Sequence, residues 1–399
     1  MNVIYMDNNN GTAVTPEVLE AMLPYFTEKC GNPLSLHDLG NEAREAVEEA
    51  RARVASLIGG KPAEIIFTST GSESNNLAIR GLSAGLSAKG KHIIVSNIEH
   101  FSVLQTAASL EKEGYQITQI PVDKYGLVDP EDVRKAIRKD TALVSIMMAN
   151  GEVGTLEPLA EISRITREQG VVFHTDAVAA AGNIPINVVE LGIDALSLAG
   201  NMFFGPKGGA ALWFRRGLRL TPQTMGGVQE GGRRAGTENV PAIVGLGKAA
   251  QMAQQRMTQR MEKVTALRDT LIKHLPEVIE HVVVTGHPQK RLPYHASFCV
   301  EFIEGESMLM LLNLSGIAIS SGSSCSSRAL KASHVLTALG LPSEIVQGSI
   351  IFGLSELNTP EDVESVIKNF PPVVSRLRGM SPLWAKYLKS KGEKPYASV

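Results

Sequence analysis

The sequence has little that would mark a disulfide-rich, membrane-spanning or nucleic-acid-binding protein. Only three cysteines occur in 399 residues, Cys30, Cys299 and Cys325, and they lie far apart. This spacing gives neither a disulfide framework nor a CxxC zinc site, and it is typical of a protein of the reducing cytoplasm. Acidic and basic residues nearly balance, 41 against 39, so charge provides no bulk attraction for nucleic acid. No apolar run approaches the roughly 18 residues of a membrane helix, and residues 1–13 lack a signal-peptide core.

What the chain does contain is a series of short, apolar, β-rich runs separated by helical patterns or loops. Near-continuous apolar strands that alternate with helices predict an α/β fold, in which a mostly parallel sheet is covered by helices on both faces. The runs expected to form strands are 64–68, 92–96, 115–120, 142–147, 171–174, 194–198 and 210–214.

The pattern changes after a long helical stretch over residues 243–275. Strands at 296–302 and 316–320, with helices near 361–378, predict a smaller α+β domain. We therefore expect a large α/β domain over residues 14–260 and a small α+β domain formed by residues 1–13 and 261–399. The basic C-terminal segment 384–399 is either a solvated terminus or an arm that docks a partner.

The carboxyl ends of the predicted strands are where a ligand is expected in an open parallel sheet. After strand 64–68 comes the segment 69–73 (STGSE), whose small residues at a helix start expose backbone N–H groups that favour a phosphate. An ordinary strand–helix turn has the same composition, so this segment alone leaves both interpretations open. Asp176 follows strand 171–174, and a buried carboxylate there needs a partner such as a protonated ring nitrogen or an arginine. His100, after strand 92–96, is either a structural or a functional histidine.

Cys325 lies in a Ser/Gly-rich run, 320–327 (SSGSSCSS), that is poorly suited to packing in a core. Arg328 and Lys331 are close in sequence, and cations near an exposed thiol lower its pKa and favour the thiolate. We therefore expect Cys325 to be the reactive cysteine, and Cys30 and Cys299 to be a helix-end and a core residue.

Taken in order, these and other segments resemble the cysteine desulfurases of the NifS/IscS type, class V members of the fold-type-I pyridoxal-phosphate (PLP) enzymes. The resemblance covers nearly the whole chain. The segments that carry it are 5–9 (YMDNN), 31–33 (GNP), 67–76 (FTSTGSESNN), 99–100 (EH), 174–177 (HTDA), 205–208 (GPKG), 229–239 (QEGGRRAGTEN), 321–325 (SGSSC) and 333–336 (SHVL).

The resemblance implies the fold-type-I architecture, with a seven-stranded, mostly parallel sheet, and a homodimer whose PLP forms a Schiff base with a lysine. It places Asp176 at the pyridine nitrogen and His100 on the ring. Gly71, Ser72 and, from the other subunit, Thr237 would hold the phosphate.

The resemblance also assigns the substrate and sulfur steps. Asn32 falls where the family contacts the substrate carboxylate. Cys325 matches the loop cysteine that attacks the sulfur of bound cysteine, becomes a persulfide and passes sulfur to a scaffold protein.

The chain departs from the family where the cofactor would be held. The Schiff-base lysine falls on Met202, whose thioether neither forms an imine nor moves a proton. Lys207 matches a lysine that the family has in addition to the catalytic one. Each lost hydrogen bond to an ionic ligand is worth about 1.5–3 kcal/mol, so several losses weaken PLP binding strongly. The family's His, Ser, Gln, second Asn and substrate-binding Arg fall on Asn201, Ala199, Ala179, Gly151 and Ile351.

The sequence therefore predicts a desulfurase-like protein of sulfur trafficking or iron–sulfur cluster assembly with little or no PLP-dependent activity. It would be a cytoplasmic homodimer in which Cys325 carries a persulfide or ligates an iron–sulfur cluster shared with a scaffold or other sulfur acceptor. Neither nucleic acid nor a membrane is expected as a partner. The alternatives are an active desulfurase that holds PLP noncovalently, a non-catalytic interaction protein, and different chemistry in the altered pocket.

Overall fold

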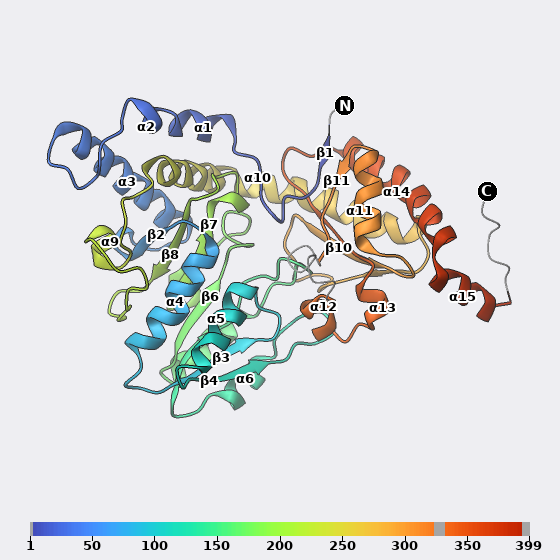
Figure 1. Ribbon diagram of the computed structural model, residues 1–399, viewed down its shortest axis with the longest axis horizontal. Coiled ribbons are helices and arrows are strands. Elements are labelled where there is room, and N and C mark those ends of the chain that lie inside the picture. The colour runs from blue at the N-terminus through green and yellow to red at the C-terminus, as the bar shows by residue number, and fades with distance from the viewer. Residues whose placement is uncertain (1–2, 323–331, 393–399) are drawn as a thin grey trace.

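In the computed structural model, which describes residues 3–322 and 332–392, seven strands form one sheet in the order β2-β8-β7-β6-β5-β3-β4 (Figure 1). All seven strands expected from the sequence are confirmed, with ends that differ by at most two residues from those predicted. Their bounds are β2 (Ile65–Thr68), β3 (His92–Ser96), β4 (Gln116–Ile120), β5 (Thr141–Ser145), β6 (Val172–Asp176), β7 (Ala195–Ala199) and β8 (Ala210–Phe214).

Strand β8 is the exception to the parallel arrangement, because it pairs antiparallel with both β7 and β2. The connection from β7 to β8 spans only residues 200–209. A parallel crossover needs about a dozen residues or more, so the chain turns back beside β7 instead.

Helices cover both faces of this sheet, as alternation along the strands requires. In β2, Ile65 and Phe67 belong to one buried cluster, whereas Ile66 belongs to the cluster on the opposite face. Residues of α4 (Gly71–Gly85) and α5 (Phe101–Glu111) pack against the Ile66 face. The other face is covered by α1 (Pro16–Met22), α3 (Asp38–Leu57), α7 (Leu159–Glu168) and the first half of α10 (Val240–Val278).

A second, smaller β structure lies at the other end of α10. It consists of a three-stranded antiparallel sheet in the order β12-β10-β9 and a parallel pair of β1 and β11. Because β1 pairs with β11, the N-terminus joins the C-terminal part of the chain (Figure 1). The strands are β1 (Ile4–Tyr5), β9 (Val282–Val284), β10 (His295–Val300), β11 (Ile317–Ala318) and β12 (Ser349–Gly353).

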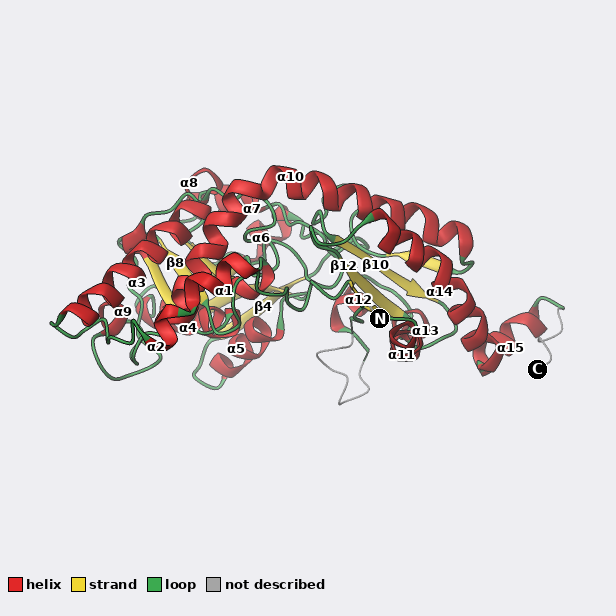
Figure 2. Ribbon diagram, turned by 90° about the horizontal axis from the view of Figure 1, so that it is seen from above, coloured by secondary structure: helices red, strands yellow, loops and turns green. Residues whose placement is uncertain are grey.

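Helix α10 is 39 residues long and extends across both β structures (Figure 2). Its residues up to Val264 belong to the core beside the large sheet, and Leu267, Leu271 and Leu275 belong to the core beside the small one. The predicted domain boundary at residue 260 falls inside this helix, and the division into domains stays a prediction.

The remaining helices cover the small sheet or lie in connections. In the part of the chain that the structure describes, no helix is both long enough and apolar enough to cross a membrane. Their bounds are α2 (Pro24–Thr27), α6 (Pro130–Ala136), α8 (Val188–Leu191), α9 (Gln229–Gly232), α11 (Gly305–Leu314), α12 (His334–Ala338), α13 (Ser343–Val346), α14 (Pro360–Met380) and α15 (Pro382–Ser390).

Candidate functional site

A cavity of about 600 Å³ lies where β2, β3, β5, β6 and β7 end and the small β structure begins. This is the place at which ligands bind in open α/β sheets, and the volume is in the range of small-molecule sites, about 300–1,000 Å³. Five of the residues singled out from the sequence line this cavity: Gly71, Ser72, His100, Asp176 and Met202.

Asp176 ends β6 at the cavity wall and is only 6% exposed. Its Oδ1 accepts the backbone N–H of Val178 at 2.9 Å, and its Oδ2 accepts an amide N–H of Asn75 at 2.6 Å. Burial raises the pKa of this carboxyl, and the two hydrogen bonds and nearby His100 oppose that rise. Among the described residues no lysine or arginine forms an ion pair with Asp176.

Asn75 and Ser102 connect Asp176 to His100. The Asn75 amide donates to Ser102 Oγ at 2.8 Å, and Ser102 Oγ lies 2.7 Å from His100 Nδ1. His100 is the N-cap of α5, and its Nδ1 accepts the Ser102 backbone N–H at 3.1 Å. An Nδ1 that accepts this bond carries no proton, so the ring proton of neutral His100 is on Nε2.

Sequence reasoning did not assign a role to Asn75 or Ser102. A signal for Asn75 was present, because it stands four residues after Gly71 and therefore on the same face of α4. The sequence held no such signal for Ser102, because its hydrogen bond with Asn75 depends on how α5 packs against α4.

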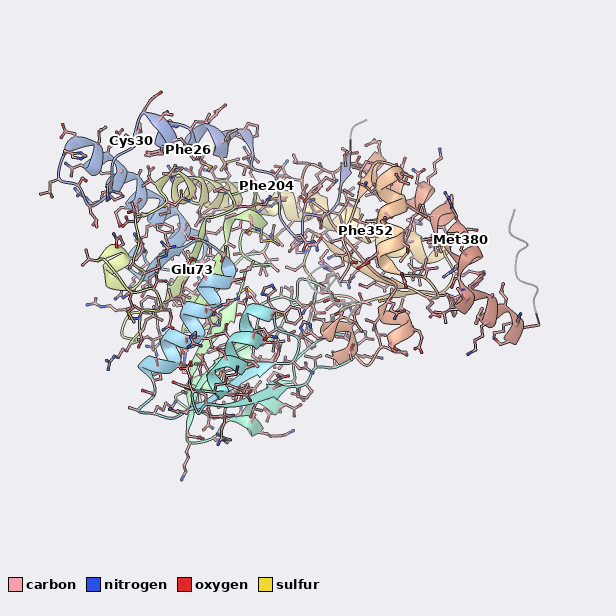
Figure 3. The ribbon with its side chains drawn as sticks, viewed as in Figure 1. Phe26, Cys30, Glu73, Phe204, Phe352 and Met380 are labelled. Carbon is pink, nitrogen blue, oxygen red and sulfur yellow. The ribbon has the colours of Figure 1, made fainter. Side chains whose placement is uncertain are left out.

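The first turn of α4 forms another wall of the cavity. Thr70 caps the helix by accepting the Glu73 N–H at 3.0 Å. A Cβ on Gly71 would come within 2.5 Å of Val178 Cγ2, so only glycine fits there without a shift. Glu73, labelled in Figure 3, also accepts the Ser69 N–H at 2.7 Å. Two side-chain hydrogen bonds thus hold the turn, and its binding of a phosphate through Gly71 and Ser72 stays a prediction.

Two ion pairs hold the loop of residues 221–239 against helices α3 and α4. Arg51 of α3 donates to both Glu230 carboxylate oxygens, at 2.7 and 2.9 Å, and the Glu230 side chain is 3% exposed. Arg234 Nε donates to Glu73 at 2.8 Å. Glu230 has a φ of 50°, in the left-handed region that a non-glycine residue rarely adopts. The Arg51 pair and the Phe67 N–H, which donates to Glu230 at 2.9 Å, hold this conformation.

Position 202 is occupied by a buried methionine at the cavity wall. Met202 ends the short helix η2 (Gly200–Met202) and is 6% exposed. PLP attaches to fold-type-I enzymes through an amine, which a thioether cannot replace. The cavity-lining part of the described chain offers one amine, Lys207, whose side chain is exposed.

The other altered positions lie around the same cavity, as the resemblance implied. Ala179, Ala199, Asn201, Gly151 and Ile351 all line it. The methionine at position 202 therefore does not suit covalent attachment of PLP, whereas binding of its ring nitrogen by Asp176 and of its phosphate by Gly71 and Ser72 stays a prediction.

Not every predicted site residue reaches the cavity within one protomer. Asn32 is exposed, does not line the cavity, and its Oδ1 accepts the Leu34 N–H at 2.9 Å. Thr237 is exposed on the 221–239 loop and also lies outside the cavity lining, and its contribution to a second subunit stays a prediction. Cys325 lies outside the described residues. Cys30 is exposed just after α2, whereas Cys299 is buried in β10, where burial raises its pKa to about 12.

Three glutamates near the cavity were given no role by sequence reasoning: Glu99 and Glu157 are buried, and Glu152 is half-buried. Glu99 is fully buried and accepts the Ser96 hydroxyl and the Met147 N–H, yet burial still raises its pKa well above the ordinary value. Burial raises the pKa of Glu152 and of Glu157 to about 8. Glu99 and Glu152 line the cavity, and Glu157 accepts the Val128 N–H at 2.9 Å.

Glu157 makes the stability of the protein depend on pH in a defined direction. Its pKa rises from an ordinary 4.5 to about 8 on folding, so between these values the folded chain holds a proton that the unfolded chain has lost. The free energy of unfolding is therefore expected to fall as pH rises from about 5 to 8. Glu157→Gln should remove up to about 1.4 kcal/mol per pH unit from this fall, measured by urea unfolding across the pH range. The exposed Glu161→Gln is the control, and equal slopes in both variants would contradict the assignment.

Known proteins are similar to this chain over nearly its whole length. The family model "Aminotransferase class-V" matches residues 4–366. A cysteine desulfurase IscS of Methanosarcina thermophila is 50% identical over 383 residues, covering 96% of this chain and 95% of that protein. A cysteine desulfurase NifS of Azotobacter vinelandii is 45% identical over 384 residues, covering 96% and 95%.

Solved structures agree with the sequence matches. A NifS-like protein superposes with a TM-score of 0.88 at 35% identity, covering 94% of this chain and all of that one. A NifS-like protein from Rickettsia africae ESF-5 gives a TM-score of 0.85 at 32% identity, with the same coverage. The fold-type-I architecture expected from the resemblance is thereby confirmed.

Proposed function

Because this chain belongs to the cysteine desulfurase family of class-V aminotransferases, we propose that it acts in sulfur trafficking or iron–sulfur cluster assembly without PLP-dependent desulfuration. One observation supports the second half of this proposal: the cavity wall holds a buried thioether, Met202, at the position where the resemblance places the family's lysine. Without an amine there, neither the covalent link to PLP nor the base that moves the substrate proton is available.

The surrounding substitutions support the same conclusion. A chance loss of one residue would leave the rest of a cofactor site intact. Here Ile351, 2% exposed at the cavity wall, cannot pair with a substrate carboxylate, and Ala179 cannot donate a side-chain hydrogen bond. Both changes remove interactions with ionic or polar ligand groups, each worth about 1.5–3 kcal/mol when the group is charged.

Cys325 is the residue that would carry sulfur. Its thiolate would attack the outer sulfur of a persulfide, R–S–SH, held by a donor thiol. The S–S bond of the donor breaks, the donor leaves as its thiolate, and Cys325 becomes the persulfide with no net oxidation. An acceptor thiolate would take the outer sulfur by the same exchange. Alternatively, Cys325 would ligate a cluster that is the cargo of a scaffold protein.

We further propose a cytoplasmic homodimer whose partner is an iron–sulfur scaffold or another sulfur acceptor. The low cysteine content and the absence of spaced metal-binding cysteines support the reducing compartment. The exposed loop of residues 221–239, with Met225 77% and Val228 72% exposed, supports contact with a second copy.

The intact Asp176–Asn75–Ser102–His100 network favours one second candidate, a desulfurase that holds PLP noncovalently. The two candidates are separated with purified protein supplied with PLP and cysteine. The proposed function expects no borohydride-stable PLP adduct above the background of the exposed lysines, and no sulfide above a protein-free control. Sulfide release in proportion to protein concentration would establish the second candidate and overturn the first.

The sulfur-carrying role is tested at Cys325 itself. Cys325→Ser should abolish transfer of sulfur from a small-molecule persulfide to the protein, and with it sulfur delivery to an acceptor thiol, because an alcohol does not undergo the exchange. Mass spectrometry of the protein after exposure to glutathione persulfide measures the added sulfur.

Cys30→Ser is the matched control, because Cys30 is an exposed cysteine outside the cavity. Unchanged sulfur loading in Cys325→Ser, with loading lost in Cys30→Ser, would overturn the role of Cys325.

A further inference from the structure

Arg260 of α10 is a buried arginine for which the described chain supplies few partners. The residue is 6% exposed, and its Nη2 donates to the carbonyl oxygen of Gly182. A guanidinium has five N–H groups, and the Nε of Arg260 is buried without a hydrogen bond. Within residues 3–322 and 332–392, no aspartate or glutamate forms an ion pair with Arg260. A buried charge without a counter-charge is costly, so an anion close to this guanidinium would stabilise the folded chain.

The ring of Phe204, labelled in Figure 3, gives the guanidinium only a weak partner. Its centroid lies 5.8 Å from Arg260 Cζ, which is near the outer limit of cation–π contacts, about 6 Å. Phe204 has a φ of 68°, in the left-handed region, and its N–H donates to Thr12 Oγ1 at 2.6 Å. The backbone is thus held in a rare conformation that places an aromatic face, and not a carboxylate, beside Arg260.

A second cavity, of about 10 Å³, borders this guanidinium between α1, residues 203–204 and α10. Such a volume holds about one particle of the size of water. Three side chains that can donate hydrogen bonds line it: Arg260, Arg256 one helical turn earlier, and Thr15, whose hydroxyl is buried without a hydrogen bond. The other described side chains of the lining are apolar apart from that of Glu356, and no histidine is among them. Donors to an anion therefore outnumber the one carboxylate at this cavity.

The charged groups around the cavity leave an excess of positive charge. Arg256 pairs with Glu17 at 3.1 Å, both side chains being 45% exposed, and Glu17 also lies near the Thr15 hydroxyl. Burial and the nearby Arg256 lower the pKa of Arg260, whereas the half-buried Glu356 opposes that fall. Lys263 donates to the backbone carbonyl of Glu356 at 2.6 Å. Three cations thus stand against two carboxylates, and neither carboxylate pairs directly with the buried Arg260.

We propose that this second cavity binds a small monovalent anion of the size of chloride, held by Arg260 and the Thr15 hydroxyl with Arg256 as a further donor. An organic carboxylate or a phosphate is larger than the cavity, and a water molecule carries no charge to balance the guanidinium. The anion would connect α1 and α10 with residues 203–204, which follow Met202 at the wall of the larger cavity. The inference depends neither on Cys325 carrying sulfur nor on the absence of PLP.

The test is the dependence of stability on chloride. Purified full-length protein is unfolded with urea while chloride replaces gluconate, which is too large for the cavity, at constant ionic strength. An anion that binds only the folded chain lowers the unfolding equilibrium constant by the factor 1 + [L]/Kd. Raising chloride from zero to about 0.5 M is expected to lower this constant about tenfold. An unchanged or increased constant would overturn the proposal.

Three variants test where the anion binds. Arg260→Met removes the guanidinium but keeps an unbranched side chain, and it should lose the chloride effect. Glu356→Gln removes the one carboxylate of the lining and should enlarge the effect. Arg376→Met is the matched control, since it makes the same exchange at an exposed position on α14, and it should respond to chloride as the original chain does. A chloride effect that persists in Arg260→Met, that shrinks in Glu356→Gln or that is lost in Arg376→Met would contradict the assignment.

Diffraction from the unaltered protein decides the question if Arg260→Met does not fold. Crystals soaked in bromide are expected to show an anomalous peak within hydrogen-bonding distance of Arg260 Nε and Thr15 Oγ1. Bromide found only at exposed arginines and lysines, or none at all, would overturn the proposal. None of these outcomes changes the expected results for sulfur loading at Cys325 or for the PLP adduct, so the two proposals fail separately.

Discussion

Exchange of Met202 for lysine is expected to convert a protein without covalent PLP into one that holds it covalently. The rest of the wall remains: Asp176 stays oriented by Asn75, and His100 stays at the start of α5. An amine placed at a position that is 6% exposed has its pKa lowered by burial, which favours the uncharged form that attacks an aldehyde. The measurement is borohydride reduction after incubation with PLP, followed by peptide mass spectrometry. The expected adduct rises from none in the original chain to the major species at residue 202.

Met310→Lys controls for reaction at an added surface lysine, because residue 310 is 71% exposed. Its adduct is expected to stay at the background of the other exposed lysines. A folded Met202→Lys protein that gives no more adduct than this control would show that position 202 does not face the PLP site. Recovery of full sulfide release by this single exchange would show that Ile351 and Ala179 do not limit the reaction.

The largest expected effect on stability comes from separating Arg51 and Glu230. In Arg51→Met the Glu230 carboxylate, 3% exposed, would keep only the Phe67 N–H as a partner at 2.9 Å. Breaking a buried ion pair from one side costs about 3–5 kcal/mol, because the remaining charge is buried without compensation. The free energy of unfolding from urea titration is expected to fall by about that amount. The same variant loses the contact of the Arg51 guanidinium with the Phe67 ring, whose centroid lies 4.7 Å away.

The control lies two residues further along α3. Arg53 pairs with Glu49, whose side chain is 63% exposed, and Arg53→Ala is expected to change the free energy of unfolding by less than about 1 kcal/mol. Removing both charges, in Arg51→Met with Glu230→Met, should recover part of the loss, since no unpaired charge remains. Equal effects of the Arg51 and Arg53 variants would contradict the assignment of a stabilising ion pair at Glu230.

Much of the fold could be predicted because each strand of a parallel sheet is apolar on both faces. Residues 92–96 and 210–214 form strands with the predicted bounds. The antiparallel direction of β8 could not be read from its composition, since it depends on the length of one connection. The strands β9 and β12 were not predicted, and β12 brings Ile351 to the cavity.

The site residues that lie at the ends of strands could be predicted from the sequence, whereas those that helix packing brings together could not. Asp176 and His100 end or follow predicted strands, so the topology brings them to one edge. Asn75 and Ser102 connect them across two helices, a relation that no spacing within one segment specifies. The burial that raises the pKa of Glu152 likewise depends on the small β structure lying against the large sheet.

The continuity of α10 has a consequence for any attempt to study the two β structures separately. At about 1.5 Å per residue its 39 residues form a rod about 58 Å long. Truncation at residue 260 would leave Val264 without the large-sheet core and would remove the N-terminal anchor of Leu267, Leu271 and Leu275. Each fragment would end in a partly unfolded segment of α10 whose apolar residues, buried in the intact chain, are exposed to solvent. The two halves are therefore expected to be stable only as parts of one continuous polypeptide.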